Sequence, residues 1–266
     1  MTLKTMTMPE LPEIYILGKY LKATSLNKKV TALDFVQTGL LRAPKKDFEK
    51  IKGKTFKEVQ QLGKYLFLKV EQDLWLGFHF GMTGKLEYYR KQDPPKYTHV
   101  VFTFEDDSHL AFVCRRKLGK IYLTSGVKDF QLEHSLGKHA LDLDLKEFLE
   151  ILEDKRGMIK AVLTDQHELS GIGNVYADEV LYQCKIHPKT STDKLTDAEK
   201  RDIHLEIGQV LRAVIKLDGE RLELPSNYLV PHRKEGADCP NCEGKVEKTT
   251  VSGRSTYFCP SCQQEK

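Results

Sequence analysis

Four cysteines near the end of the chain place the strongest constraint on what it can fold into. They form two Cys-x-x-Cys pairs, Cys239 with Cys242 and Cys259 with Cys262, and sixteen residues separate the pairs. Two such knuckles supply the four thiolates that one tetrahedral zinc ion requires. Residues 231–266 are too few to fold by apolar burial alone, whereas zinc binding worth about 10–16 kcal/mol could fold them. We therefore predict one structural zinc ion, and two disulfides or a redox dithiol are the competing interpretations.

The composition is that of a globular protein with one large or two medium domains. The 266 residues are 40% hydrophobic and 30% charged, and the net charge of +4 permits a polyanionic partner without requiring one. Two basic runs, residues 115–117 and 232–234, are interpreted on their own as solvated surface. The chain has no apolar run near the roughly 20 residues of a membrane span, no signal-peptide core and no secreted cysteine pattern. We expect a soluble, intracellular protein that does not bind membranes.

Short strands dominate residues 30–123. Runs such as 65–70, 100–104 and 120–123 are rich in aromatic and β-branched residues, and turn-forming residues separate them. Several short strands at near-regular spacing predict an antiparallel β-sandwich or barrel. One helix precedes the strands, because apolar residues recur with helical spacing over residues 11–23.

Helical periodicity replaces the strand pattern after residue 139. Segments 146–152, 158–163, 175–183 and 198–215 repeat with helical period, and acidic residues open the last of them. The predicted class is α+β with two domains. The predicted boundaries are a β-rich N-terminal domain at 9–135, a hinge at 136–145, a helical domain at 146–230 and the zinc hairpin at 231–266.

Two short segments combine residue types that chemistry could use. Residues 170–179 are a glycine-rich turn running into a helix, so that backbone and helix N-terminus could approach a phosphate. A plain helix-turn-helix with glycine for tight packing would have the same pattern. In residues 9–13, Glu10 and Glu13 flank a proline, which by spacing alone indicates the start of a helix.

Six segments occur in a fixed order along the chain. They are Pro-Glu-Leu-Pro-Glu at 9–13, Gly-Lys-Tyr-Leu at 63–66, His-Phe-Gly-Met-Thr-Gly at 79–84, Arg-Lys-Leu-Gly at 116–119, Asp-Gln with Gly-Ile-Gly-Asn-Val-Tyr within 165–176, and the cysteine hairpin with Gly-Arg at 253–254. Together they closely resemble the formamidopyrimidine-DNA glycosylase / endonuclease VIII family of base-excision repair enzymes. The Pro-Glu-Leu-Pro-Glu segment and Met82 are more similar to the formamidopyrimidine branch (oxidised purines) than to the endonuclease VIII branch (oxidised pyrimidines).

The resemblance implies a fold, a partner and a reaction. The fold is an N-terminal antiparallel β-sandwich with flanking helices, followed by a helix-two-turn-helix DNA-binding domain with a zinc-finger β-hairpin. The implied enzyme is a bifunctional glycosylase and AP lyase that removes oxidised bases of the 8-oxoguanine and formamidopyrimidine type. Its partner is double-stranded DNA containing oxidised bases or abasic sites. We expect a monomer located in the cytoplasm at the nucleoid.

The resemblance also implies the residues that carry the chemistry. A proline at the mature N-terminus is a secondary amine, so Pro9 would attack C1′ of the damaged nucleotide and form a Schiff base. Glu10 would be the general acid and base on the deoxyribose. The full catalytic set is Pro9, Glu10, Lys64 and Arg254. Glu13 matches a second family carboxylate, near the base pocket or at the helix start.

The DNA-binding residues implied by the resemblance fall into two groups. Lys64, Asn174 and Arg254 would bind phosphates beside the lesion and hold the flipped-out backbone. Met82, Arg116 and Leu118 would fill the gap left by the everted nucleotide, which offsets the cost of unstacking a base. The 8-oxoguanine-type members usually carry phenylalanine where this chain has Leu118.

The sequence departs from the family pattern most at its start. Eight residues precede Pro9, and an acylated proline nitrogen has no nucleophilic lone pair. We expect synthesis to begin at Met8, followed by removal of that methionine. If the extension persists, Lys64 is the nearest candidate amine, and the chain would be a non-catalytic binder of damaged or abasic DNA. Two more functions fit part of the sequence: an endonuclease VIII-like glycosylase specific for oxidised pyrimidines, and an unrelated zinc-ribbon protein.

Two smaller departures lie towards the C-terminus. Tyr257 stands in the hairpin where a histidine is common in the family. Residues 216–227 fall where the family has a lesion-capping loop, and they match no clear pattern.

Overall fold

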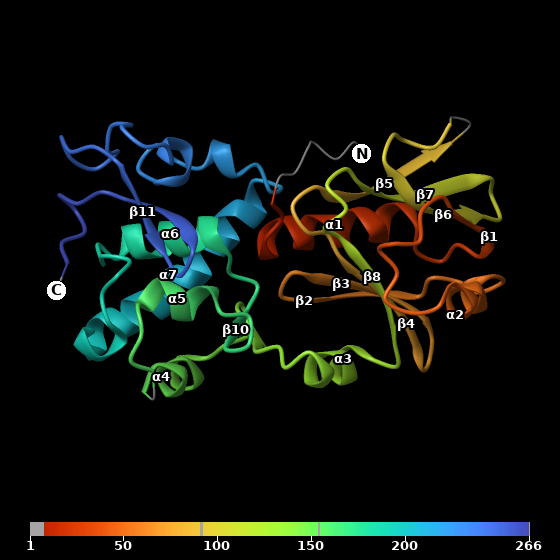
Figure 1. The fold of residues 1–266 in the computed structure, drawn as a ribbon, viewed down its shortest axis with the longest axis horizontal. Helices are drawn as coiled ribbons and strands as arrows, with labels where there is room; N and C mark the ends of the chain where they lie inside the picture. Colours follow the sequence, from red (N-terminus) through yellow and green to blue (C-terminus); the bar gives the residue numbers. More distant parts are fainter. Residues whose placement is uncertain (1–7, 91–92, 154, 266) are drawn as a thin grey trace. The chain divides into compact units, whose positions relative to one another are not determined.

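The computed structural model describes residues 8–90, 93–153 and 155–265. The chain forms two compact units that meet in the sequence between Ser135 and Leu136. Figure 1 shows strands concentrated in the N-terminal unit and helices in the C-terminal unit. In the described part of the chain, no helix combines the length and apolarity needed to cross a membrane.

The N-terminal unit contains two four-stranded antiparallel sheets. One has the order β1-β6-β7-β5 and the other the order β2-β3-β4-β8. The strands are β1 (Val30–Phe35), β2 (Glu58–Leu62), β3 (Tyr65–Glu71), β4 (Leu74–His79), β5 (Gly84–Arg90), β6 (Thr98–Phe104), β7 (Ser108–Cys114) and β8 (Lys120–Thr124). Apolar side chains from both sheets form one buried core, so the predicted sandwich is confirmed.

Helix α1 (Leu11–Thr24) closes this core on the side of β2 and β3. Ile14, Leu17 and Leu21 are at most 1% exposed and belong to the same core cluster, as their helical spacing predicts. Gly18 lets the helix approach closely, because a Cβ there would lie 3.3 Å from a methyl group of Leu66. The middle of α1 is thereby packed against β3.

Three short helical segments of this unit lie outside the predicted elements. They are α2 (Lys45–Phe48), η1 (Glu49–Ile51) and α3 (Val127–Glu133). In α3 only Phe130 is buried, and its ring lies 5.0–5.1 Å from the rings of Tyr65, Phe67 and Tyr122. A single apolar anchor leaves no periodic pattern in the sequence, which explains why the segment escapes prediction.

The C-terminal unit is helical with a terminal hairpin. The helices are α4 (Leu145–Glu153), α5 (Ile159–Thr164), α6 (Asn174–Gln183) and α7 (Asp197–Lys216), within two residues of the predicted segments, and the short turns are η2 (Thr192–Lys194), η3 (Arg221–Glu223) and η4 (Val230–His232). Strands β11 (Glu247–Val251) and β12 (Arg254–Phe258) form the antiparallel hairpin. Strands β9 (Lys138–His139) and β10 (Leu169–Ser170) pair in parallel, so part of the predicted hinge is strand.

Helix α6 is the buried centre of this unit. Its residues from Val175 to Tyr182 are all buried, including two carboxylates. One of these, Glu179, accepts hydrogen bonds from the backbone N–H groups of Leu229 and Val230 at 3.0 and 2.6 Å. This carboxylate therefore fixes η4, the segment that leads into the cysteine hairpin, to the central helix.

Candidate functional site

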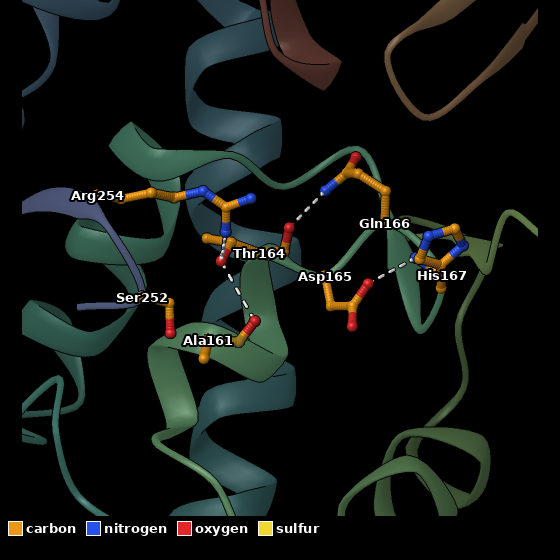
Figure 2. Close-up of a pocket in the computed structure, with 7 residues that line it drawn as sticks. All are labelled: Ala161, Thr164, Asp165, Gln166, His167, Ser252 and Arg254. Atoms are coloured by element: carbon orange, nitrogen blue, oxygen red, sulfur yellow. Dashed lines mark hydrogen bonds between the residues drawn. The ribbon is translucent and has the colours of Figure 1, made fainter.

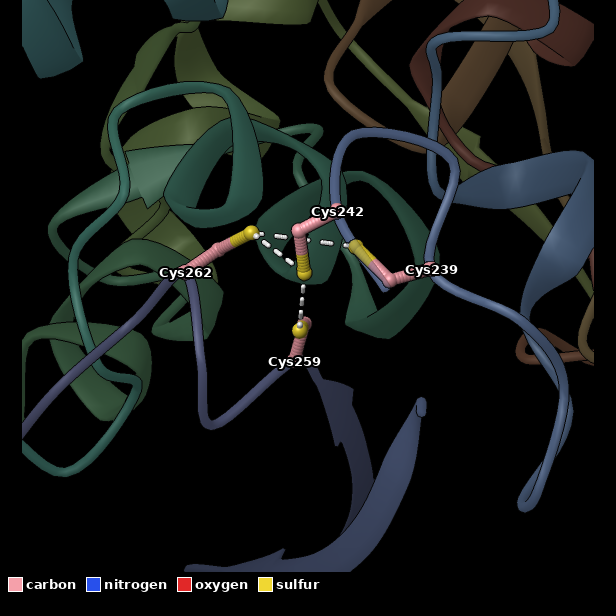
Figure 3. A group of neighbouring side chains, drawn as sticks. All are labelled: Cys239, Cys242, Cys259 and Cys262. Carbon is pink, nitrogen blue, oxygen red and sulfur yellow. Dashed lines mark hydrogen bonds between the residues drawn. The ribbon is translucent and has the colours of Figure 1, made fainter. Parts of the chain in front are cut away.

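The four cysteine sulfurs converge at the base of the hairpin (Figure 3). All four lie within 4.8 Å of one another, and the closest pairs are 3.4–3.7 Å apart. These distances exclude disulfides, whose sulfurs lie about 2.05 Å apart. A tetrahedral site with zinc–sulfur bonds of about 2.3 Å has edges of about 3.8 Å. The donor set and its geometry therefore fit one zinc ion.

The second cysteine knuckle is tied to the helical body by Gln263. Its side-chain oxygen accepts from the N–H of Cys259 at 3.0 Å, and its side-chain nitrogen donates to the carbonyl of Ile186 at 2.8 Å. Gln263 is 1% exposed, so both bonds are shielded from water. The position of the knuckle is thus set by tertiary contacts as well as by the metal.

Arg254 stands at the tip of the hairpin, directly after a turn in which Ser252 and Gly253 both have positive φ. Its guanidinium donates to the hydroxyl of Thr164, the last residue of α5. Figure 2 shows the pocket beside this contact. The pocket has a volume of 460 Å³ and is lined by Ala161, Thr164, Asp165, Gln166, His167, Ser252 and Arg254.

Asn174 begins α6 and contacts the hairpin strand that carries Arg254. Its side-chain nitrogen donates to the carbonyl of Ser255 at 2.7 Å. An amide nitrogen carries two N–H groups, so one donor remains for a ligand. Asn174 and Arg254 are both predicted phosphate ligands, and the structure places Asn174 against Ser255, the residue that follows Arg254.

Asp178, one turn further along α6, is the centre of a buried charge network. Its carboxylate lies 2.6 Å from the Lys160 ammonium and 2.7 Å from the Arg233 guanidinium, and it accepts from the N–H of Tyr257 at 3.1 Å. Burial raises the pKa of Asp178, and the two cations oppose that shift. Lys160 also donates to the Thr256 hydroxyl at 2.6 Å. The network therefore fixes strand β12 between α5 and α6.

Two side chains of this network differ from what the sequence predicts. Solvated surface is the prediction for residues 232–234, but the Arg233 side chain is only 13% exposed because it pairs with Asp178. The sequence assigns no role to Tyr257, yet the Arg233 guanidinium lies 4.5 Å above the centre of its ring. The stacking adds to the charge pairing, so Tyr257 helps to hold Arg233.

In the N-terminal unit, Pro9 and Glu10 lead into α1 and both are buried. Glu10 is the N-cap, and its N–H donates to the Glu13 carboxylate at 2.9 Å in a reciprocal capping box. Glu13 is 2% exposed. The geometry accounts for Glu13 as a residue of the helix start, which is one of its two predicted roles.

Lys64 lies close to this helix start. It occupies a two-residue turn between β2 and β3, where Gly63 adopts a φ of 53°. The Gln61 side chain donates to the carbonyls of Leu11 and Gly63, at 2.9 Å in each case. Gln61 therefore bridges the first turn of α1 to the turn that carries Lys64, a link that the sequence pattern does not reveal.

His79 is a further candidate that the sequence does not single out. It pairs with Tyr65 across β3 and β4, and burial together with Lys120 and Lys64 lowers its pKa to about 4. Within the described ranges, its Nδ1 is buried without a hydrogen-bond partner. His79 belongs to the motif at 79–84, and only that membership could have drawn attention to it.

Met82, Arg116 and Leu118, which the resemblance assigns to one gap, lie on two neighbouring loops that connect β4 to β5 and β7 to β8. The Arg116 guanidinium contacts the Met82 sulfur at 3.0 Å, and Leu118 is 47% exposed. Gly81 has a φ of 58°, and a Cβ there would lie 2.6 Å from the backbone of Leu118. The backbone N–H of Met8 donates to the Met82 carbonyl at 3.0 Å, which places this group next to Pro9.

Three family models match successive parts of the chain. They are described as the formamidopyrimidine-DNA glycosylase N-terminal domain at residues 8–121, the formamidopyrimidine-DNA glycosylase H2TH domain at residues 136–226, and a zinc finger found in FPG and IleRS at residues 238–264. Together with the clustered cysteines, the last match confirms the predicted structural zinc ion.

Relatives match over almost the whole chain. The formamidopyrimidine-DNA glycosylase of Pelotomaculum thermopropionicum is 34% identical, over 97% of this chain and 100% of the relative. The enzyme of that name from Streptococcus mutans serotype c is 31% identical with the same coverage. These matches confirm the resemblance inferred from the six segments.

Solved structures match the fold equally well. A complex between Lactococcus lactis Fpg and abasic-site-containing DNA has a TM-score of 0.88 and 30% identity, covering 96% of this chain and 100% of that chain. A structure of MutM with DNA containing carbocyclic 8-oxo-G also has a TM-score of 0.88 and 30% identity, covering 97% and 100%. The predicted fold class is thereby confirmed.

Proposed function

The chain belongs to the formamidopyrimidine-DNA glycosylase family, and from this premise we propose that it is a base-excision repair DNA glycosylase with AP lyase activity. Its substrate is duplex DNA that carries oxidised bases of the 8-oxoguanine and formamidopyrimidine type, and it acts on the nucleoid. The observation that carries the proposal is the cluster at the start of α1. Pro9 and Glu10 lie there beside the turn of Lys64 and the Met82 loop.

The proposed reaction uses the nitrogen of Pro9 as nucleophile. Its lone pair forms a bond to C1′ of the damaged nucleotide, and the C1′–base bond breaks with its electron pair leaving on the base. Glu10 accepts the N–H proton of Pro9 and delivers it to O4′ as the C1′–O4′ bond opens, and the freed lone pair of Pro9 forms an iminium with C1′ of the sugar. The iminium acidifies the C2′ proton, so successive β- and δ-eliminations expel the 3′ and 5′ phosphates.

This chemistry requires that Pro9 carry a free amine. A proline acylated by Met8 is a tertiary amide, and its lone pair is delocalised into the carbonyl. The N-terminal family model begins its match at residue 8, which supports a mature protein that starts at Pro9 after removal of Met8. An intact mass of the protein from its native source decides this point.

Charged and polar side chains of both units supply the proposed grip on DNA. Lys64, Asn174 and Arg254 bind phosphates beside the lesion, and the neutral ring of His79 adds a hydrogen-bonding group beside Lys64 without a further positive charge. The resemblance assigns the gap in the stack to Met82, Arg116 and Leu118. The contact of Arg116 with Met82 and the close approach of Leu118 to Gly81 support a role as one unit, because a wedge must keep its shape against the stacked bases.

Borohydride trapping tests the proposal directly. Protein expressed from Met8 is incubated with an 8-oxoguanine duplex and sodium borohydride, and the expected product is a covalent complex whose DNA is attached at Pro9. The matched control is protein that retains residues 1–8, which should bind the duplex without being trapped. Absence of a trapped complex and of strand cleavage with the Met8-started protein would refute the enzymatic proposal.

One observation favours a second candidate function. Eight residues precede Pro9 in the chain, and if they are retained the protein keeps its DNA grip without the nucleophile. It would then bind abasic DNA tightly and leave it uncut. Protein purified from its native source would carry the extension and give no trapped complex, whereas protein started at Met8 would still react.

A further inference from the structure

Three residues on one face of α6 hold the cysteine hairpin. Asn174, Asp178 and Tyr182 are spaced four residues apart, so their side chains leave the helix on the same side. Asn174 contacts Ser255 and Asp178 contacts Tyr257, as described above. Tyr182 contacts the metal site itself, through the sulfur of Cys239. The first two contacts position β12, whereas the third has a chemical consequence.

The Tyr182 hydroxyl lies 3.1 Å from the Cys239 sulfur. Tyr182 is 2% exposed and Cys239 is 6% exposed, and both belong to one buried cluster that also contains Leu229, Val246 and Cys259. A buried tyrosine hydroxyl needs a hydrogen-bond partner. Among the residues that the structure describes, Cys239 is the only partner of this hydroxyl.

The direction of this hydrogen bond follows from the metal site. A cysteine bound to zinc is a thiolate and has no proton to donate, so the tyrosine hydroxyl must be the donor. Four thiolates around one Zn²⁺ leave a net charge of −2, and a donor aimed at one sulfur draws off part of that excess. The N–H of Gly244, 3.3 Å from the Cys242 sulfur, does the same from the backbone.

We propose that Tyr182 is a positioning residue of the zinc site. Its hydroxyl donates to the Cys239 thiolate, strengthens zinc binding and fixes the first knuckle to helix α6. Apart from the cysteines themselves, no other side-chain donor reaches a zinc-ligand sulfur in the described part of the chain. This inference rests on the zinc site alone and is independent of the glycosylase activity.

The variant Tyr182→Phe removes the hydroxyl and keeps the ring. Because loss of an outer hydrogen bond typically weakens metal binding by about 10–100-fold, zinc affinity measured by competition with a chromophoric chelator should fall about tenfold or more. In cobalt-substituted protein, the sulfur-to-metal charge-transfer band should move to longer wavelength, since the thiolate regains electron density. The proposal would be overturned if the zinc affinity of the variant stayed within about twofold of wild type and the cobalt band were unchanged.

Tyr20→Phe is the matched control. The Tyr20 hydroxyl is also buried and accepts from the N–H of Tyr88 at 2.8 Å, but it lies in the N-terminal unit. This variant should lose a comparable buried hydrogen bond and leave zinc affinity and the cobalt band unchanged. An equal effect of the two variants on zinc affinity would mean that Tyr182 acts only through general stability, which would also overturn the proposal.

A measurement on the unaltered chain keeps the proposal testable if Tyr182→Phe fails to fold. In protein loaded with cadmium-113, a hydroxyl proton that donates to a metal-bound sulfur exchanges slowly with water and couples through that sulfur to the metal. A correlation between cadmium and the Tyr182 hydroxyl proton is the expected result. Its absence, in a spectrum that contains the cysteine Hβ correlations, would refute the hydrogen bond.

Discussion

Replacement of Asp178 by asparagine should strongly destabilise the C-terminal unit. The variant preserves the shape of the side chain but leaves the Lys160 ammonium, 1% exposed, without its partner at 2.6 Å. At an effective dielectric constant of about 20, two unit charges at this distance attract by about 6 kcal/mol. The measurable loss is smaller, because a buried lysine without a partner can give up its proton. Broken buried pairs lose about 3–5 kcal/mol, and we expect this range.

The pH dependence of the variant follows from the same reasoning. Burial already lowers the pKa of Lys160 below its ordinary value of 10.5, and loss of Asp178 removes the main opposing influence. A lysine whose pKa is lower in the folded state binds fewer protons there than in the unfolded chain. The stability of Asp178→Asn should therefore increase as the pH rises towards the ordinary lysine pKa of 10.5.

The two-unit architecture supplies an internal reference for the assay. Trp75, the only tryptophan in the chain, lies on β4 of the N-terminal unit, whereas the long helices of the C-terminal unit dominate the helical signal. In urea, the helical circular dichroism transition of Asp178→Asn should move to lower concentration while the Trp75 fluorescence transition stays in place. Glu150→Gln, which breaks an exposed pair with Lys146 on α4, should change stability by less than about 0.5 kcal/mol.

Two results would refute this reasoning. A loss of less than about 1 kcal/mol in Asp178→Asn would mean that Lys160 is solvated or paired elsewhere. The triple variant Lys160→Met, Asp178→Leu and Arg233→Met, which removes both cations together with the carboxylate, should recover most of the loss, because apolar replacement of a buried ion pair or triad is often neutral. Failure to recover would show that the network's geometry, and not the unpaired charge, dominates.

Two further predictions concern DNA binding and pH. Arg254→Ala, with zinc retained, should weaken binding irrespective of DNA sequence and reduce the slope of log K against log salt by about 1. Lys248→Ala on the same hairpin should preserve the slope. Equal slopes in both variants would contradict a specific phosphate contact. The pKa of His79 is about 4 in the folded protein, below its ordinary value of 6.5, so the unfolded chain binds a proton at His79 at a higher pH than the folded protein does. The free energy of unfolding of the wild type should therefore fall by up to about 3 kcal/mol as the pH falls from 6.5 to 4. His79→Gln should flatten this part of the stability profile, and an unchanged slope would exclude His79 as its cause.

Local patterns explain which parts of the fold were predictable. The strands β3, β6 and β8 are short runs rich in aromatic and β-branched residues, and the four longer helices of the C-terminal unit repeat apolar residues with helical period, so the residues themselves indicate the element. Helix α3 has one buried anchor, Phe130, and β9 and β10 are two residues long. Elements this short carry no period, and their partners are distant in the chain.

The two cysteine knuckles determined, by themselves, a zinc site and the hairpin around it, because metal ligands have a fixed chemistry and spacing. The neighbours of that site were decided only by the tertiary structure. In the sequence, Asp178 resembles any helical acid and Tyr182 any core tyrosine. The fold places two cations beside the buried Asp178 and a thiolate beside the buried Tyr182. The sequence does not reveal these partners, because a polar group removed from water is stabilised only by the partner that the fold brings to it.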